Sequence, residues 1–584
     1  MKRFTRRNDG GMALVMALFF IGIAVLVAGI LMSRVMQQRR VVVHYEDYNL
    51  AFLGLESALS AVEVALKNGD DGIIGIEGWE PQWDNANKLT LPDFDSEYVT
   101  PQTLESMDGV EFAAYTVAWA DDGRDNNGDG LTDDVAEEWM FTAYAMARKG
   151  AAVRRAEVVY RGDNVNVWQN AMFAGPGLVG GLINGSVNAH GSVHMLGDNL
   201  LGGVLGLATL GLAGTTTIRN NYGSIPAVLE SRIPDPPQTV VAGETVSTLG
   251  ATLRSKQGLI SLGGGSSLGS PQALGNAVKE TLDGVFVTGG WIGDAVLPDG
   301  DRGDPTNVYS DNGWDELYDL GDRVVFPALD SLFSSGQGGA TVTNPDTGQA
   351  YKHDEYFEQV LVGDPDIPDD GIFAGNITLD TAGAHFYWNA TTGDQMTGSL
   401  PGTSPPKTED YILFDRNRDV LEINGQIAID GNLEFTGSGA QLAIYYTGKG
   451  AILVKGNVRL NSHLLSCNNG DPSDVAGSFP VDNALGIMAG NSITIGKSLL
   501  GPLGLGLLSG PELNLMGAFY AQEKITSLNR SNIAGTLVTN YFDLTLNPPA
   551  VYQVPALGRN LPEGMVGDFP IIGITQLSWR ELGV

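Results

Sequence analysis

The feature that most constrains this chain is an uncharged apolar run from Met12 to Met32, MALVMALFFIGIAVLVAGILM. As a helix rising about 1.5 Å per residue, it would span about 30 Å, the thickness of the hydrocarbon core of a bilayer. A positive cluster before such a run favours a cytoplasmic N-terminus, although basic residues also follow it at Arg34, Arg39 and Arg40. The run therefore predicts a single-pass membrane protein whose remaining chain is exported. The preceding basic residues are Lys2, Arg3, Arg6 and Arg7.

A cleaved signal peptide is the alternative interpretation, but it would have a shorter apolar core followed by a small-x-small cleavage site. Here Gly10 and Gly11 lie directly before the run. A short basic leader ending in glycine before a long apolar segment resembles a type IV prepilin leader, and in particular the PilX-like pilus assembly proteins. The resemblance implies cleavage between Gly11 and Met12 by a prepilin peptidase, methylation of Met12, and an inner-membrane helix that packs against other pilin-like subunits.

The chain departs from the major pilins at one position. Major pilins carry glutamate at the fifth mature position, which is Met16 here. PilX-like and GspK-like proteins can lack this glutamate, and GspK-like subunits lie at a filament tip. The departure implies a minor or tip subunit of a type IV pilus or related secretion filament. The segments YYTGKGAILVKGNV and MGAFYAQEKI, in the C-terminal part of the chain, also resemble segments of such proteins.

The apolar run is followed by a second helical pattern. The segment YNLAFLGLESALSAVEVALKNG places apolar residues at helical spacing, and Gly69 stands in a C-cap position. We therefore expect a leader over residues 1–11 and one helix over residues 12–69, with the second half packed on its own domain. The apolar positions are Leu50, Leu53, Leu55, Ala58, Leu59, Val62, Val64 and Leu66.

Residues 70–163 carry the signals of a small antiparallel sheet. Three segments read as strands: VEFAAYTVAWA, EWMFTAYAMARKG and AAVRRAEVVYRG, the last with clear alternation. We expect a meander that packs on the N-terminal helix. An acidic loop connects its first two strands.

The residue pattern of the sequence changes at about Asn164, where short apolar runs are separated by Gly and Asn. With 78 Gly in 584 residues, glycine is about twice as frequent as usual. Paired apolar positions such as Ile427/Ile429 and Ile452/Val454 suggest short strands stacked as a right-handed parallel β-solenoid, with Asn adopting the left-handed conformation at its corners. A β-sandwich is the alternative.

We assign residues 164–216 and 421–545 to the solenoid, 217–420 to an acidic loop-rich insertion, and 546–584 to a Pro-rich C-terminal cap. The expected fold is thus mainly β with an N-terminal helix.

The acidic loop, DDGRDNNGDGLTDD from Asp121 to Asp134, resembles a calcium-binding loop. The EF-hand spacing D-x-[DN]-x-[DN]-G is matched from Asp125 to Gly130. The twelfth position is Ala136 instead of Glu, so the closing carboxylate is left open between Asp134 and Glu137. A solvated acidic turn is the alternative. We expect a structural Ca²⁺ held by Asp125, Asn127, Asp129, the Leu131 carbonyl and Asp133, with Asp134 or Glu137 closing the shell.

The overall charge excludes one class of partner and leaves others open. The net charge is −34 and no basic stripe is visible, so we expect no nucleic-acid partner. The single cysteine, Cys467, excludes an intramolecular disulfide. His190 and His194 lack a third ligand nearby, which argues against a metal site there.

The sequence as a whole favours a non-enzymatic, pilin-like structural protein whose β-solenoid head is displayed in the periplasm or at the cell surface for assembly or for adhesion to a surface or polysaccharide. Two alternatives stay open. One is a membrane-anchored surface adhesin with no filament role. The other is a polysaccharide-active enzyme, which would need clustered carboxylates on one solenoid face.

Overall fold

A computed structural model describes most of the chain. The described chain divides into two compact units. The helix–sheet unit comprises Met1–Asp163 and Gly573–Val584, and the solenoid unit comprises Asn164–Ile572. The residues not described are 1–9, 69–71, 80–90, 105–106, 108, 120–123, 125–139, 165, 178–182, 186, 198–207, 213–216, 263–265, 289–290, 293–306, 316, 321–323, 334–341, 346, 363–370, 438–441, 498, 501–506, 509–510, 545–546, 568–570 and 583–584.

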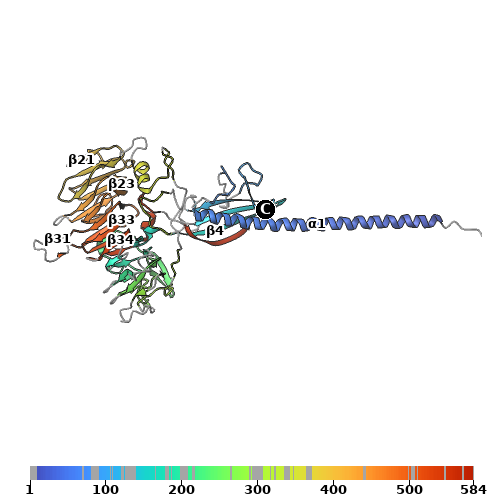
Figure 1. Ribbon diagram of the computed structural model, residues 1–584, viewed down its shortest axis with the longest axis horizontal. Coiled ribbons are helices and arrows are strands. Elements are labelled where there is room, and N and C mark those ends of the chain that lie inside the picture. The colour runs from blue at the N-terminus through green and yellow to red at the C-terminus, as the bar shows by residue number, and fades with distance from the viewer. Residues whose placement is uncertain are drawn as a thin grey trace, which may run out of the picture. The chain divides into compact units, whose positions relative to one another are not determined.

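The helix–sheet unit consists of one long helix and a five-stranded sheet (Figure 1). Helix α1 runs from Gly10 to Asn68, and the sheet order is β1-β2-β3-β4-β36. The pairs β1–β2, β2–β3 and β3–β4 are antiparallel, which confirms the predicted meander. Strand β3 is buried along most of its length because both faces of the sheet are covered. The bounds are β1 Gln102–Thr103, β2 Val110–Ala118, β3 Met140–Lys149, β4 Ala152–Asn164 and β36 Ile571–Leu582.

The two faces of this sheet are covered by different segments. Helix α1 packs against β2 and β3 on one face. On the other face, Ile76, Leu91, Phe94 and Val99 form a small core with Met146 and its neighbours on the strands. The sheet therefore has a hydrophobic layer on each side, which explains the nearly continuous apolar stretch of β3.

Strand β36 corrects the predicted C-terminal cap. The expectation that residues 546–584 form one irregular cap is wrong, because residues 571–582 form a sheet strand next to β4. Residues 550–552 form another strand in the solenoid. In chain order, the whole solenoid unit is thus inserted between two neighbouring strands of the small sheet.

The solenoid is built from coils of short strands that stack in parallel register. In a representative pair of coils, β23 lies on β26, β24 on β27 and β25 on β28. The inward residues align from coil to coil: Ile427 pairs with Ile452, and Leu433 with Val458. All four are buried, as the paired apolar pattern predicts. The predicted parallel solenoid is therefore confirmed.

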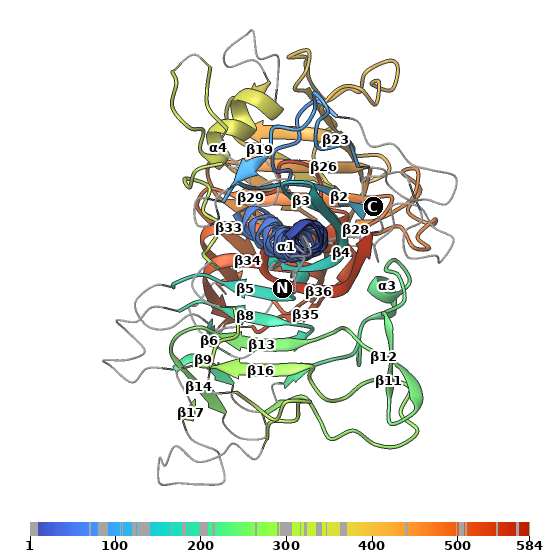
Figure 2. The same ribbon diagram turned by 90° about the vertical axis from the view of Figure 1, so that its right-hand side faces the viewer.

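The order of coils in the stack differs from their order in the chain (Figure 2). Strand β5, the first of the unit, pairs in parallel with β34, one of the last, and β7 pairs with β35. From this junction the stack continues in one direction through β8, β13 and β16, and in the other through β33, β29, β26 and β23. Both ends of the solenoid sequence therefore meet inside the stack.

The strands on one side of the junction are β5 Met172–Ala174, β6 Ile183–Gly185, β7 Asn188–His190, β8 Val193–Met195, β9 Ala208–Leu212, β10 Thr217–Arg219, β13 Thr252–Ser255, β14 Leu259–Leu262, β15 Ser267–Leu268, β16 Gly284–Val287 and β17 Trp291–Ile292. Those on the other side are β18 Ile372–Phe373, β19 Ile377–Asp380, β20 Phe386–Asn389, β21 Gln395–Thr397, β22 Tyr411–Asp415, β23 Val420–Ile429, β24 Leu433–Thr436, β25 Ala443–Thr447, β26 Lys449–Val454, β27 Val458–Asn461, β28 His463–Ser466, β29 Ala484–Ala489, β30 Ser492–Ile495, β33 Leu513–Ser527, β34 Ser531–Leu544 and β35 Ala550–Tyr552.

Short hairpins and helical turns accompany the stacked strands. Two small hairpins join β11 to β12 and β31 to β32. Their bounds, with those of the short helical turns, are β11 Gln238–Val241, β12 Glu244–Ser247, β31 Leu499–Leu500, β32 Leu507–Leu508, η2 Val167–Gln169, α3 Ala227–Glu230, α4 His353–Tyr356, η3 Phe357–Leu361 and η4 Pro555–Arg559.

The predicted insertion over residues 217–420 is wrong for much of its length. Strands β10 and β13–β17 continue the solenoid in parallel register with β7, β8 and β9. The described residues of 324–362 form a crossing segment outside the named strands, between β17 at one end of the stack and β18 at the other. It is tied to the stack by Phe326, which stacks on Tyr520 at 5.7 Å between ring centroids, and by an ion pair of 3.1 Å between Glu358 and Lys455.

The recurring Gly-Asn pairs mark corners where successive coils touch. A Cβ on Gly456 would lie 2.5 Å from the carbonyl oxygen of Gly431 in the next coil, so the corner requires glycine. The adjacent Asn432 and Asn457 form an amide ladder, in which the backbone N–H of Asn457 donates to Oδ1 of Asn432 at 2.8 Å. Neither asparagine has a positive φ, so the expected left-handed conformation is wrong at these corners. The asparagines satisfy backbone donors instead.

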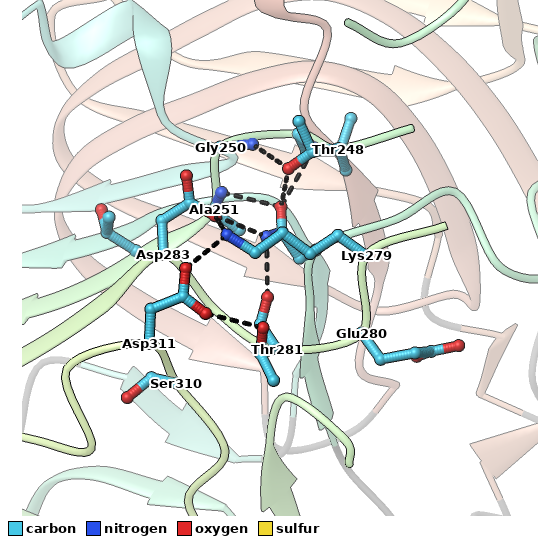
Figure 3. A network of polar contacts seen from close by, with 12 residues as sticks. Thr248, Gly250, Ala251, Lys279, Glu280, Thr281, Asp283, Ser310 and Asp311 are labelled. Carbon is cyan, nitrogen blue, oxygen red and sulfur yellow. Dashed lines mark hydrogen bonds and ion pairs between the residues drawn. The ribbon is translucent and has the colours of Figure 1, made fainter. Parts of the chain in front are cut away.

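A different polar network holds the coils at the far end of the stack (Figure 3). Lys279 is almost buried and pairs with Asp283 at 2.7 Å and Asp311 at 2.6 Å. Oδ1 of the fully buried Asn220 accepts hydrogen bonds from the backbone N–H groups of Leu249 and Ala251. Burial alone would lower the pKa of Lys279, but the two aspartates outweigh it and raise that pKa. The network therefore links several successive coils through satisfied polar groups.

At the junction, His190 of β7 packs on Tyr552 of β35 with ring centroids 4.4 Å apart. Its Nδ1–H donates to the carbonyl oxygen of Asn221 at 2.8 Å. Burial lowers the pKa of His190 to about 4, against the opposing effect of this hydrogen bond. The imidazole is therefore neutral in the folded protein at neutral pH.

Substituting Gly456→Ala should lower the free energy of unfolding by about 1–3 kcal/mol, because the new Cβ meets backbone and the coils must separate to admit it. The measurement is urea unfolding of the full chain in detergent micelles, followed by circular dichroism. Gly402→Ala is the matched control, since a Cβ on Gly402 meets no atom within 4 Å. Equal stability of the two variants would contradict the close stacking at Gly456.

Acidification should weaken the junction through His190. The folded pKa is depressed from 6.5 to about 4, so the stabilisation is present above about pH 6.5 and lost as the pH falls through about 4. A depression of this size corresponds to about 3 kcal/mol. In the same unfolding assay, His190→Gln should flatten the pH profile between 6.5 and 4, whereas His44→Gln, at an exposed site on α1, should not. Superimposable profiles for wild type and His190→Gln would refute this assignment.

Candidate membrane and assembly helix

The N-terminal half of α1 is an apolar surface without a covering. Every residue from 14 to 46 is exposed. An 18-residue window of this helix has a mean hydropathy of 3.0, and none of it is buried. By length and composition the helix is long and apolar enough to cross a membrane. Leu18, Phe19 and Leu26, for example, each expose 60% or more of their surface.

The C-terminal half of α1 is the core helix of its unit. Ala51, Leu55, Ala58, Val62 and Leu66 are spaced three or four residues apart, and each is at most 3% exposed. This spacing places them on one face of the helix, toward β2 and β3.

Other apolar positions of the predicted pattern lie outside this core. Leu53 is 40% exposed and Val64 is 58% exposed, so they form part of the outer face. On the inner face, Gly54 allows the helix to approach closely, since a Cβ there would lie 2.6 Å from Cγ1 of Val110.

A buried hydrogen bond fixes the helix on the sheet. The Tyr160 side chain of β4 is 1% exposed and is hydrogen-bonded to Glu63 of α1. Burial first, and then the nearby charge of Glu63, raise the pKa of Tyr160 above its ordinary value. The phenol therefore stays protonated and can donate to the carboxylate.

The strand that follows the solenoid is attached to the helix by side chains. The Arg154 guanidinium lies 3.8 Å from the Tyr48 ring centroid and 4.8 Å from that of Phe52. Its Nε lies 3.1 Å from Oε1 of Glu581 on β36. Trp579 of β36 also contacts Phe52 edge to face at 6.5 Å between centroids. This strand was not predicted from the sequence, although the alternation in ITQLSWREL is a strand signal.

The predicted processing site lies at the beginning of α1. Gly11 and Met12 are helical, but their side chains, like residues 1–9, lie outside the described part of the chain. Met16, at the fifth position after the predicted cut, is 57% exposed on the helix surface. Cleavage and methylation stay predictions.

The predicted calcium loop connects β2 to β3, since β2 ends at Ala118 and β3 begins at Met140. All of its predicted ligands lie outside the described residues, so the site stays a prediction. These ligands are Asp125, Asn127, Asp129, Leu131, Asp133, Asp134 and Glu137. Within the described residues, no group of three or more His, Cys, Asp or Glu side chains is placed to hold a metal ion.

The two histidines of HGSVHM do not form a common site. His190 bonds to Asn221, whereas Nε2 of His194 lies 2.7 Å from the Tyr318 hydroxyl. Burial lowers the pKa of His194 well below its ordinary value. Asp311 is the partner of Lys279, and Cys467 is a buried free thiol.

Comparison with known proteins gives a similarity of structure. No protein-family model matches the chain, and no curated protein matches it. Among solved structures, the chain is similar to the crystal structure of the competence-associated pilin ComZ from Thermus thermophilus, with 16% sequence identity and a TM-score of 0.42. The alignment covers 100% of this chain and 99% of that chain.

Proposed function

We propose that this protein is a non-enzymatic, pilin-like subunit of a type IV pilus or related secretion filament. The observation that carries the proposal is the continuity of α1. One helix carries an uncovered apolar segment directly after Gly10 and Gly11, and ends as the core helix of a small antiparallel sheet.

This continuity imposes a physical requirement on the N-terminal half. Apolar surface of this length is unfavourable in water and must be covered by lipid or by protein. A membrane satisfies this requirement before assembly, and the helices of other pilin-like subunits satisfy it in a filament. The proposed localisation is therefore a single pass through the inner membrane, with both folded units exported.

A minor or tip position is the second part of the proposal. Met16 supports it, because an apolar residue stands where the resemblance expects the glutamate of a bulk subunit. The size of the solenoid unit, Asn164–Ile572, also suits a displayed head for assembly or adhesion better than a repeating subunit.

The mature N-terminus tests this proposal. When the full chain is expressed in a cell that has a prepilin peptidase, mass spectrometry should find a chain that begins at a methylated Met12. Gly11→Val should retain the leader because the bulkier residue occupies the cleavage position, whereas Gly29→Val, far inside the apolar run, should still be processed. An intact Met1 in the wild type would favour a membrane-anchored adhesin, and a cut beyond Met32 would favour an ordinary signal peptide; either result contradicts the proposal.

A structural Ca²⁺ in the loop after β2 is a further part of the proposal. Six aspartates lie in the stretch from Asp121 to Asp134, and such carboxylates repel one another strongly at short range unless a cation lies among them. The loop joins β2 and β3, which pair along the whole length from Val110 to Ala118. A bound Ca²⁺ would tie these two strands together in a chain that has only one cysteine.

Removal of Ca²⁺ should therefore destabilise the helix–sheet unit. At free Ca²⁺ about 100-fold above the dissociation constant, binding contributes about 2.7 kcal/mol, and this should appear as a lower melting temperature in excess EDTA. The double substitution Asp125→Asn and Asp129→Asn should melt early and ignore EDTA, whereas Asp482→Asn, at an exposed site in the solenoid unit, should keep the wild-type response. An unchanged wild-type melt in EDTA would rule out the structural cation.

A further inference from the structure

The part of α1 that follows the apolar span carries exposed positive charge. Arg34, Arg39 and Arg40 all lie on the open surface of the helix, and none of them forms an ion pair with a residue that the structure describes. The sequence has no acidic residue from Met12 to Tyr45 that could neutralise them. These three side chains, called the arginine band below, have no role in the proposed function as stated so far.

The arginine band is unusual in a chain that is otherwise strongly acidic. Residues 1–45 contain seven basic and one acidic side chain, whereas residues 46–584 contain 27 basic and 67 acidic side chains. Basic residues that flank a membrane span collect mainly on its cytoplasmic side, so three arginines on the exported side run against this preference. Their position therefore indicates a specific use for positive charge directly after the span.

The distance along the helix places the arginine band at the level of the lipid headgroups. At about 1.5 Å per residue, Arg34 lies about 3 Å beyond Met32, and Arg39 and Arg40 lie about 10–12 Å beyond it. The headgroup layer extends about 5–7 Å beyond the hydrocarbon core on each side. Side chains on a helix lean toward its N-terminus, which here is toward the membrane, so the long arginine side chains can reach back into this layer.

Two of these arginines share a shallow hollow with apolar side chains. The hollow has a volume of about 360 Å³, and its lining consists of Met36, Arg39, Arg40, Val43, His44 and Asp47. Guanidinium groups bind phosphate oxygens through paired, charge-assisted hydrogen bonds, and the aliphatic groups of Met36 and Val43 offer contact to the carbon atoms beside a phosphate. The carboxylate of Asp47 stands about two helical turns beyond Arg40, at the end of the hollow that is farther from the membrane.

A second copy of the chain suits the arginine band less well. Two copies that cross the same membrane in the same direction hold their arginine bands at the same depth. Like charges at one depth repel each other, and the repulsion is strongest where little water intervenes. An anionic headgroup at that depth removes this repulsion as well as the charge of each band.

We propose that the arginine band binds the phosphate groups of anionic phospholipids. This inference rests on the proposed membrane span, but it does not depend on cleavage after Gly11 or on assembly. Bound lipid fixes the depth of α1 in the bilayer. The acidic remainder of the chain is repelled by the same anionic headgroups, so attraction is confined to the band.

The test is competition between two lipids in one micelle. The full chain in dodecyl maltoside micelles receives equal amounts of dioleoyl phosphatidylglycerol, which is anionic, and dioleoyl phosphatidylcholine, which is zwitterionic. Native mass spectrometry then gives the ratio of the two lipids retained by the protein. We expect the wild type to retain phosphatidylglycerol in preference, and this preference should weaken as the salt concentration rises.

The triple variant Arg34→Gln, Arg39→Gln and Arg40→Gln should lower the phosphatidylglycerol-to-phosphatidylcholine ratio by about fivefold or more, since one basic side chain near an anionic surface contributes about fivefold in affinity. The matched control is Lys407→Gln, Lys497→Gln and Arg530→Gln, which removes three exposed positive charges from the solenoid unit and should keep the wild-type ratio. Replacing the same three arginines of the band by lysine should retain most of the preference. Circular dichroism should be equal for all variants, because the band has no partner among the described residues.

The proposal is overturned if the wild type retains both lipids equally, or if the glutamine variant keeps the wild-type ratio. It is also overturned if the control loses the preference to the same extent. Displacement of phosphatidylglycerol by inorganic phosphate, beyond that by sodium chloride at equal ionic strength, would assign the band to free phosphate instead. Dimers that appear without anionic lipid and disappear in the glutamine variant would assign it to a second copy. Each of these results leaves a mature Met12 unaffected, whereas an intact Met1 contradicts the proposed function without changing the lipid ratio.

Discussion

The structure of the solenoid depends on the parallel pairing of β34 and β35 with β5 and β7. These strands lie more than 350 residues apart in the chain, yet they join two stacks of coils into one core. Without this pairing, each stack would present an open row of backbone N–H and C=O groups and an uncovered apolar interior. The stability of every other coil therefore depends on a contact between the two ends of the solenoid sequence.

The helix–sheet unit is subject to a different constraint, because the two halves of its one helix have different environments. Its C-terminal half follows the rule for a soluble core, with small and aliphatic side chains on one face and Gly54 at the closest approach. Its segment from Met12 to Met32 has no charged residue on any face, which is the pattern of a helix surrounded by lipid or by other helices. A single continuous helix therefore transmits any displacement of its N-terminal segment directly to the sheet.

Local patterns predicted most elements, because each was determined by residues close together in the chain. Helical spacing identified Leu55, Ala58 and Val62 as core, and alternation identified β4. The paired positions Ile427 and Ile429 predicted the inward face of a coil. The spacing did not distinguish Leu53 and Val64, which lie on the outer face, because the direction of the apolar face depends on the sheet that covers it.

The sequence did not predict which strands pair when they are far apart in the chain. Nothing local marks β5 as the partner of β34, since the register of such short strands is set by the finished stack. The strands of residues 217–292 were hidden by prolines and acidic loops between them. The Gly-Asn corners were recognised, but their reason was steric contact and amide pairing between coils, which no single segment contains.

The position of β36 determines when the small sheet can be completed. During synthesis from the N-terminus, β4 emerges about 400 residues before β36, so its outer edge has no partner until the entire solenoid has been made. An open strand edge can pair with the edge of another chain. The helix–sheet unit therefore passes through a period in which a neighbouring polypeptide could take the place that β36 later fills, and the solenoid determines the length of that period.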